Sequence, residues 1–121
     1  MAIHPDDPPR SLLGLPRIIS TEKDLSELLN MIDSPSNGFT MCAGSYGANP
    51  DNDLVGIIER YGHRLSFTHL RSTKTIEGKD WCFYEADHLA GDTDMYGIVR
   101  ALVKEQIKSI ALIIFPLILK M

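Results

Sequence analysis

The sequence carries little positive charge and no cluster of it. Its 121 residues include 12 Lys and Arg against 16 Asp and Glu, which gives a formal net charge of −4. A surface that binds nucleic acid needs a basic patch to displace counterions from the phosphates. The charge pattern therefore argues against a nucleic-acid-binding protein.

Cysteine is also scarce, since the chain contains only Cys42 and Cys82. The first ten residues hold His, Asp and Pro instead of the basic region and apolar core of a secretory signal. We therefore expect a cytoplasmic location, where thiols stay reduced. Each thiol would then either pack in the interior or bind a ligand, and we expect Cys82 to pack.

Long apolar runs are missing as well. The most apolar stretch, residues 110–119, is only ten residues long and is interrupted by Pro116. A helix that crosses the roughly 30 Å of membrane hydrocarbon needs about 20 apolar residues. The sequence therefore predicts no membrane-spanning segment.

Three segments show the apolar spacing of amphipathic helices. The first begins at a cap formed by Ser20 or Thr21, and Thr21 with Asp24 has the spacing of a capping box. The second follows a cap at Asp51 or Asn52 and ends at Gly62, where a left-handed residue is expected. The third follows an acidic segment, which suits the positive end of a helix dipole. The apolar stripes lie in residues 25–32, 54–61 and 95–103.

Four short apolar runs alternate with these helices and predict β-strands. The order β-α-β-α-β-α-β predicts an α/β fold with a parallel sheet and right-handed crossovers. Residues 72–91 are polar and predict a long loop, a kind of segment that often carries function. Four such units make half of an eight-stranded barrel, which takes roughly 250 residues. The predicted strands are residues 1–3, 39–42, 65–70 and 110–115.

Residues with metal-binding side chains fall at the ends of three successive predicted strands. His4 ends the first strand, Cys42 ends the second, and His69 lies near the end of the third. In parallel α/β sheets the carboxyl ends of the strands meet at one edge and carry the active site. A thiolate with two imidazoles suits Mn, Fe or Zn. Their separation in sequence matches no short metal motif, so a structural role for each residue stays open.

Three further residues are candidates for substrate binding. Arg71 could hold a carboxylate with two hydrogen bonds, or it could form a surface ion pair. Ser45 lies in the glycine-containing segment after Cys42, which could approach a ligand or form an ordinary turn. His88 lies near acidic residues in the long predicted loop, which leaves its role open. His63 follows a predicted helix end and is interpreted as structural.

Six ordered motifs run along the chain between residue 2 and residue 95. They are AIHPDDPP (2–9), GLPRI (14–18), CAGS (42–45), DNDL (51–54), FTHLR (67–71) and HLAGDTDM (88–95). Together they resemble the mannonate dehydratase family, and the similarity continues to about residue 106. Because several motifs occur in order, the match is far more specific than any one of them.

The resemblance implies a TIM barrel of the xylose-isomerase-like type, of which residues 1–107 would form the C-terminal half. It implies dehydration of D-mannonate to 2-dehydro-3-deoxy-D-gluconate in hexuronate (glucuronate) breakdown, with Mn²⁺ or Fe²⁺ as the cofactor. The family's metal ligands include the positions that match His4, Cys42 and His69. These are the same three residues that the strand pattern singles out.

The chain also departs from the family pattern. The N-terminal half-barrel is missing, and the apolar tail, residues 108–121, reads KSIALIIFPLILKM. This tail lacks the Asp-His-Gly-His stretch and the later Tyr that supply the family's fourth metal ligand and its acid and base. We expect either an enzyme completed by a complementing N-terminal half or a homo-oligomer, or a truncated, catalytically inactive remnant. The motif set disfavours a third possibility, a barrel that isomerises or epimerises sugars.

Overall fold

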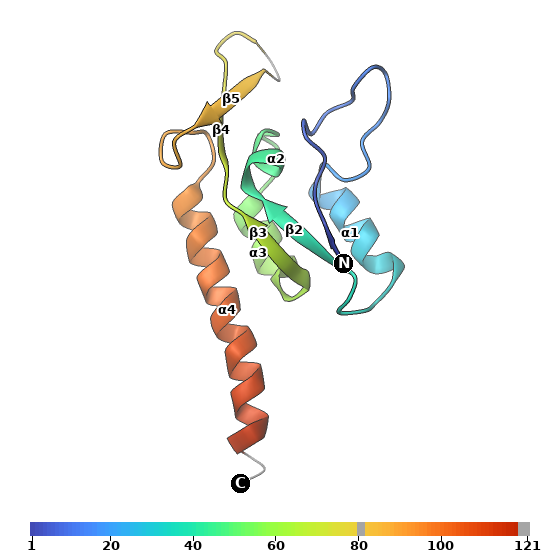
Figure 1. Ribbon diagram of the computed structural model, residues 1–121, viewed down its shortest axis with the longest axis vertical. Helices are drawn as coiled ribbons and strands as arrows, with labels where there is room; N and C mark the ends of the chain where they lie inside the picture. The colour runs from blue at the N-terminus through green and yellow to red at the C-terminus, as the bar shows by residue number, and fades with distance from the viewer. Residues whose placement is uncertain (80–81, 119–121) are drawn as a thin grey trace.

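The computed structural model describes residues 1–79 and 82–118, with side chains described as far as residue 108. Residues 80–81 of the predicted loop and 119–121 of the predicted tail lie outside the described residues. The elements, shown in Figure 1, are β1 (Ala2–Ile3), α1 (Glu22–Met31), β2 (Gly38–Cys42), α2 (Ala43–Gly47), α3 (Leu54–Tyr61), the 3-10 turn η1 (Gly62–Arg64), β3 (Leu65–His69), β4 (Ser72–Thr75), β5 (Phe83–Ala86) and α4 (Met95–Ile118).

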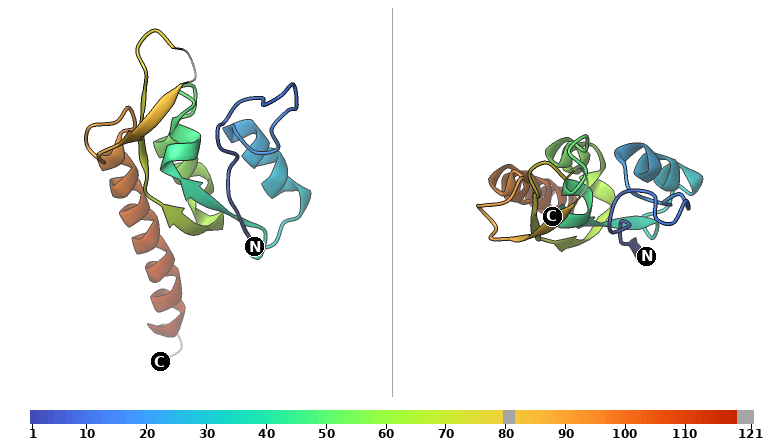
Figure 2. Two further views of the ribbon diagram at one scale, coloured as in Figure 1. Left: turned by 45° about the horizontal axis from the view of Figure 1, so that its top comes forward. Right: turned by 90° about the horizontal axis from the view of Figure 1, so that it is seen from above.

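Strands β1, β2 and β3 form a parallel sheet in that order. The register places Ile3 beside Phe39 and, at the other end of β2, Cys42 beside His69. Helices α1, α3 and α4 lie on one side of this sheet (Figure 2). The predicted α/β class and parallel sheet are therefore confirmed. Closure of the sheet into a barrel stays a prediction.

The central strand β2 is the best-buried element, since all five of its residues are buried. Phe39 and Met41 pack in a core with apolar side chains from the helices, among them Leu25, Ile57 and Ile98. Full burial of such a side chain contributes about 1.5–3 kcal/mol relative to exposure. The core thus fixes β2 and, with it, the position of Cys42 at its carboxyl end.

One of the two predicted helix caps is present in the structure. The capping box of Thr21 and Asp24 is present at the start of α1, so that prediction is confirmed. Helix α3 is capped by Asp53 and not by Asp51 or Asn52 as predicted; its carboxylate accepts a backbone N–H three residues later at 2.9 Å. Asn52 instead donates its side-chain amide to two backbone carbonyls in neighbouring segments, which holds the turn before α3.

The prediction of a left-handed Gly62 is wrong. Its φ is −55°, and the chain continues from it into η1. The glycine is required by space, because a Cβ at this position would lie 2.6 Å from Cγ of Glu105 on α4. Gly62 therefore permits the close approach of α3 and α4.

The prediction of a loop over residues 72–91 is also wrong in part. Strands β4 and β5 pair antiparallel in this segment, with Ser72 opposite Ala86 and Thr75 opposite Phe83. The segment is polar, yet its strands contain the β-branched and aromatic residues that pleated sheets favour. The hairpin brings residues of β5 close to the end of β3.

The predicted fourth strand, residues 110–115, is part of helix α4, so this prediction is wrong. No Gly, Asn or Pro occurs between Gly97 and Pro116 to end the helix. A short apolar run cannot by itself distinguish a strand from a helix. Within the described part of the chain, no helix is long and apolar enough to cross a membrane. Helix α4 also runs through residue 107, where a domain boundary was predicted. That boundary stays a prediction.

Candidate metal centre

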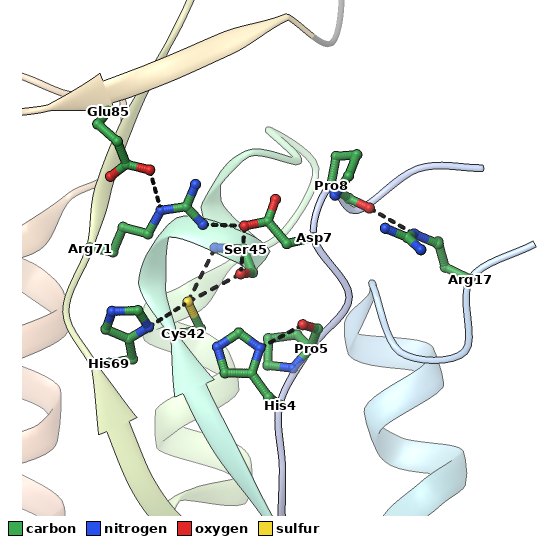
Figure 3. Close-up of polar contacts among 10 residues, drawn as sticks. All are labelled: His4, Pro5, Asp7, Pro8, Arg17, Cys42, Ser45, His69, Arg71 and Glu85. Atoms are coloured by element: carbon green, nitrogen blue, oxygen red, sulfur yellow. Dashed lines mark hydrogen bonds and ion pairs between the residues drawn. The ribbon is translucent and has the colours of Figure 1, made fainter. Parts of the chain in front are cut away.

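The three predicted metal ligands come together at the carboxyl ends of β1, β2 and β3 (Figure 3). The ligand atoms of His4, Cys42 and His69 all lie within 4.8 Å of one another. Sγ of Cys42 is 3.4 Å from Nδ1 of His69, and the two imidazole centroids are 6.0 Å apart. Cys42 is buried, whereas both histidines are exposed. Solvent therefore reaches the trio from the side of the two histidines, whereas the side of Cys42 is buried.

Local structure fixes two of these side chains. Cys42 ends β2 and caps α2, so that its Sγ accepts the backbone N–H of Ser45 at 3.5 Å. His4 follows β1 directly, and its Nδ1 lies 2.8 Å from the carbonyl oxygen of Pro5. If Nδ1 carries the proton and donates it to that carbonyl, the lone pair is on Nε2, which can then bind a metal.

The donor set fits a divalent transition metal. Imidazole nitrogen and thiolate sulfur bind such ions at about 2.0–2.3 Å, so that donors of one ion lie roughly 3–4 Å apart. The 4.8 Å limit in this structure exceeds that spacing slightly. Small changes in the side-chain torsions of the two exposed histidines would close the difference. Three protein ligands also leave coordination positions for water or substrate oxygen atoms.

A second polar cluster borders the trio (Figure 3). Ser45 is fully buried, and its Oγ lies 3.2 Å from Sγ of Cys42 and 3.4 Å from Oδ2 of Asp7. Arg71 donates from Nη1 to the same Oδ2 of Asp7 and from Nε to Oε1 of Glu85, the latter at 2.7 Å. Arg71 thus forms the ion pairs that were the alternative to substrate binding. Ser45 lies against the sulfur of a predicted ligand.

The guanidinium of Arg71 is held from several sides. Gly44 leaves space for it, since a Cβ there would lie 2.6 Å from Cγ and Cδ of Arg71. The guanidinium carbon lies 5.9 Å from the ring centroid of Phe83. Burial lowers the pKa of Arg71, but the hydrogen bonds with Asp7 and Glu85 outweigh burial and raise the pKa overall. The two ion pairs use two of five N–H donors, so donors remain for a carboxylate.

The other predicted residues lie outside the trio. His88 is exposed, and its Nε2 lies 3.0 Å from the carbonyl oxygen of Leu70. Cys82 is exposed, so the prediction that it packs is wrong. Asp7 and Glu85 were not among the residues predicted for this site. Asp7 lies in the same motif as His4, which was a usable signal, whereas Glu85 reaches the site only because the β4–β5 hairpin forms.

Comparison with known proteins agrees with the motifs. The model of the D-mannonate dehydratase (UxuA) family matches residues 1–114. The chain belongs to the mannonate dehydratase family. The mannonate dehydratase of Saccharophagus degradans is 59% identical over 106 residues, which cover 88% of this chain and 26% of that relative. The mannonate dehydratase of a Marinomonas species is 56% identical over 108 residues, which cover 89% of this chain and 27% of that relative.

A solved structure of the mannonate dehydratase family shares the fold of the chain. The crystal structure of mannonate dehydratase from Streptococcus suis serotype 2 superposes with a TM-score of 0.79 at 43% identity, over 88% of this chain and 31% of that chain. The predicted family is therefore confirmed. The chain spans about a quarter of the length of the curated relatives. Its assignment to the C-terminal half of a barrel stays a prediction.

Proposed function

We propose that this chain supplies the metal-binding strand ends of a mannonate dehydratase. Such an enzyme is a carbon–oxygen hydro-lyase that converts D-mannonate to 2-dehydro-3-deoxy-D-gluconate and water in hexuronate catabolism. The observation that carries the proposal is the convergence of His4, Cys42 and His69 in a chain of this family. Bound there, Mn²⁺ or Fe²⁺ would stabilise the negative charge that develops when a proton is removed beside a carboxylate, and would assist loss of hydroxide.

In this proposal the trio binds the metal, and Arg71 and His88 bind the substrate. Cys42 presents its sulfur from a buried position, while His4 and His69 bind from the exposed side. Arg71 binds and orients the substrate carboxylate through the N–H groups that Asp7 and Glu85 leave free. His88 is exposed beyond the end of β3, where it could bind a hydroxyl group of the sugar acid.

A partner would complete the enzyme. Among the described residues, β1 and β3 each pair only with β2, so both edges of the sheet can accept a further strand. We propose that a complementing N-terminal half or a second copy of the chain joins this sheet, and that the xylose-isomerase-like barrel forms in that assembly. We also place the protein in the cytoplasm, because the metal centre needs Cys42 as a free thiol and both cysteines are free.

A dehydratase assay tests the function. The purified chain is incubated with D-mannonate and Mn²⁺, and the 2-keto acid product is followed. We expect slow turnover that requires Mn²⁺, is abolished by Cys42→Ser and survives His63→Ala, which changes an exposed histidine outside the trio. A folded chain that binds Mn²⁺ without turnover would support the second candidate, an inactive remnant. A chain that binds no Mn²⁺ would refute the metal centre.

A further inference from the structure

The hydroxyl of Ser45 has two acceptors within reach but only one proton. Its Oγ lies 3.2 Å from Sγ of Cys42 and 3.4 Å from Oδ2 of Asp7. The O–H···O distance usually falls between 2.5 and 3.0 Å, so the contact with Asp7 is long. Sulfur is a larger atom, so 3.2 Å to Sγ is a close contact.

The neighbours of Asp7 favour the same choice of acceptor. Oδ2 of Asp7 already accepts a hydrogen bond from Nη1 of Arg71. Sγ of Cys42, in contrast, receives the backbone N–H of Ser45 at the longer distance of 3.5 Å, and its contact at 3.4 Å with Nδ1 of His69 is with another predicted metal ligand. A thiolate bound to a cation keeps a negative charge that further donors stabilise. The Ser45 hydroxyl therefore forms a more favourable hydrogen bond with the sulfur of Cys42 than with the carboxylate of Asp7.

Burial makes this donor hard to replace. Ser45 and Cys42 are both fully buried, so a water molecule cannot readily take the place of the hydroxyl. Ser45 is also the third residue after Cys42, in the first turn of α2, so the backbone that positions the sulfur positions the hydroxyl as well. The two side chains thus form one preorganised unit.

We propose that Ser45 is a positioning residue for the metal centre and not a substrate contact: its hydroxyl donates to the sulfur of Cys42 and so sets the orientation and the electron density of the thiolate ligand. This inference rests on the proposed function, because it requires an ion at His4, Cys42 and His69. It is an alternative to the sequence-based prediction that Ser45 binds the substrate, and the full burial of Ser45 beside a ligand sulfur favours the positioning role.

Cobalt titration of the chain tests this inference. Co²⁺ is the probe, since a thiolate ligand to Co²⁺ produces a charge-transfer absorption that reports on the sulfur. We expect Ser45→Ala to weaken Co²⁺ binding about 10-fold, the usual effect of losing a partner of a metal ligand. The absorption should also move to lower energy, because a sulfur that loses a hydrogen bond gives up electron density more easily. Ser45→Thr keeps the hydroxyl and should restore the energy of the absorption.

The matched control is Ser72→Ala. Ser72 is also buried, at 2% exposure, and its Oγ has no hydrogen-bond partner among the described residues. A general effect of removing a buried hydroxyl would alter both variants equally. We expect Ser72→Ala to leave both the Co²⁺ affinity and the absorption unchanged.

The outcomes separate this inference from the proposed function. A wild-type absorption that Ser45→Ala leaves unmoved, in energy and in affinity, would overturn the role of Ser45 and keep the metal centre. An equal shift of the absorption in Ser72→Ala would likewise overturn the role of Ser45 and keep the metal centre. A wild-type chain without any thiolate absorption would overturn the metal centre itself and this inference with it.

Discussion

An ion held by His4, Cys42 and His69 would join β1, β2 and β3 at their carboxyl ends, so metal binding should stabilise the folded chain. An ion that binds only the folded state at 100 times its dissociation constant contributes about 2.7 kcal/mol. Unfolding entropy is about 2.1 cal/mol/K per residue, which for 121 residues is roughly 0.25 kcal/mol/K. The melting temperature should therefore rise by about 10 °C in saturating Mn²⁺ or Co²⁺.

The variant that tests this prediction is His69→Ala. Because His69 is exposed, its loss should change the metal-free stability by only about 0.5 kcal/mol, while most of the metal-dependent rise disappears. His63 is also exposed but lies in η1, outside the trio, so His63→Ala should keep the full metal-dependent rise in melting temperature. Circular dichroism melts with the ion and with a chelator measure both quantities. An undiminished rise in His69→Ala, or no rise in the wild type, would refute the reasoning.

Three further predictions concern the surroundings of the site. Burial raises the pKa of Asp24, but hydrogen bonds from Ser20 and Thr21 outweigh burial and lower the pKa below 3.8. The stabilisation from Asp24 is therefore present above that pH and is lost as the pH falls through the folded-state pKa. Urea unfolding from about pH 5 to pH 2 should show a smaller loss of unfolding free energy in Asp24→Asn than in the wild type. Tyr46→Phe removes a buried hydroxyl without a hydrogen-bond partner among the described residues and should raise the free energy of unfolding by about 1 kcal/mol; a loss in urea unfolding would contradict this. Gly44→Ala should cost about 1–3 kcal/mol in the same measurement, because its Cβ would displace the side chain of Arg71.

The sequence predicted the parts of the fold that depend on local chemistry and strong periodicity. The capping box at Thr21 marks the start of α1, and the first three strands lie close to their predicted positions. The failures have a common physical origin. Residues 110–115 are apolar enough for a strand or a helix, and continuity with the preceding helical turns decides for a helix. The β4–β5 hairpin depends on pairing between segments, which polarity alone does not report.

The residues of the site also fall into those that the sequence could predict and those that it could not. His4, Cys42 and His69 could be grouped from the sequence because a parallel sheet brings the ends of successive strands to one edge. Their geometry agrees with that grouping, although metal binding itself stays a proposal. The contacts of Arg71 with Asp7 and Glu85 could not be predicted, since they depend on the path of the loop after β1 and on the hairpin after β3.

The position of each donor in the sheet accounts for its chemical type. Cys42 ends the central strand, where all five residues are buried. A carboxylate in that position would carry an uncompensated buried charge whenever the ion is absent, at a cost of several kcal/mol. A cysteine side chain avoids this cost, because it packs as a small apolar group. The histidines lie at the carboxyl ends of the two outer strands and are exposed to water, so neither has to be desolvated in the metal-free chain. A fold with these donors can form before the metal arrives, and so the metal would add stability to an existing structure without being required for folding.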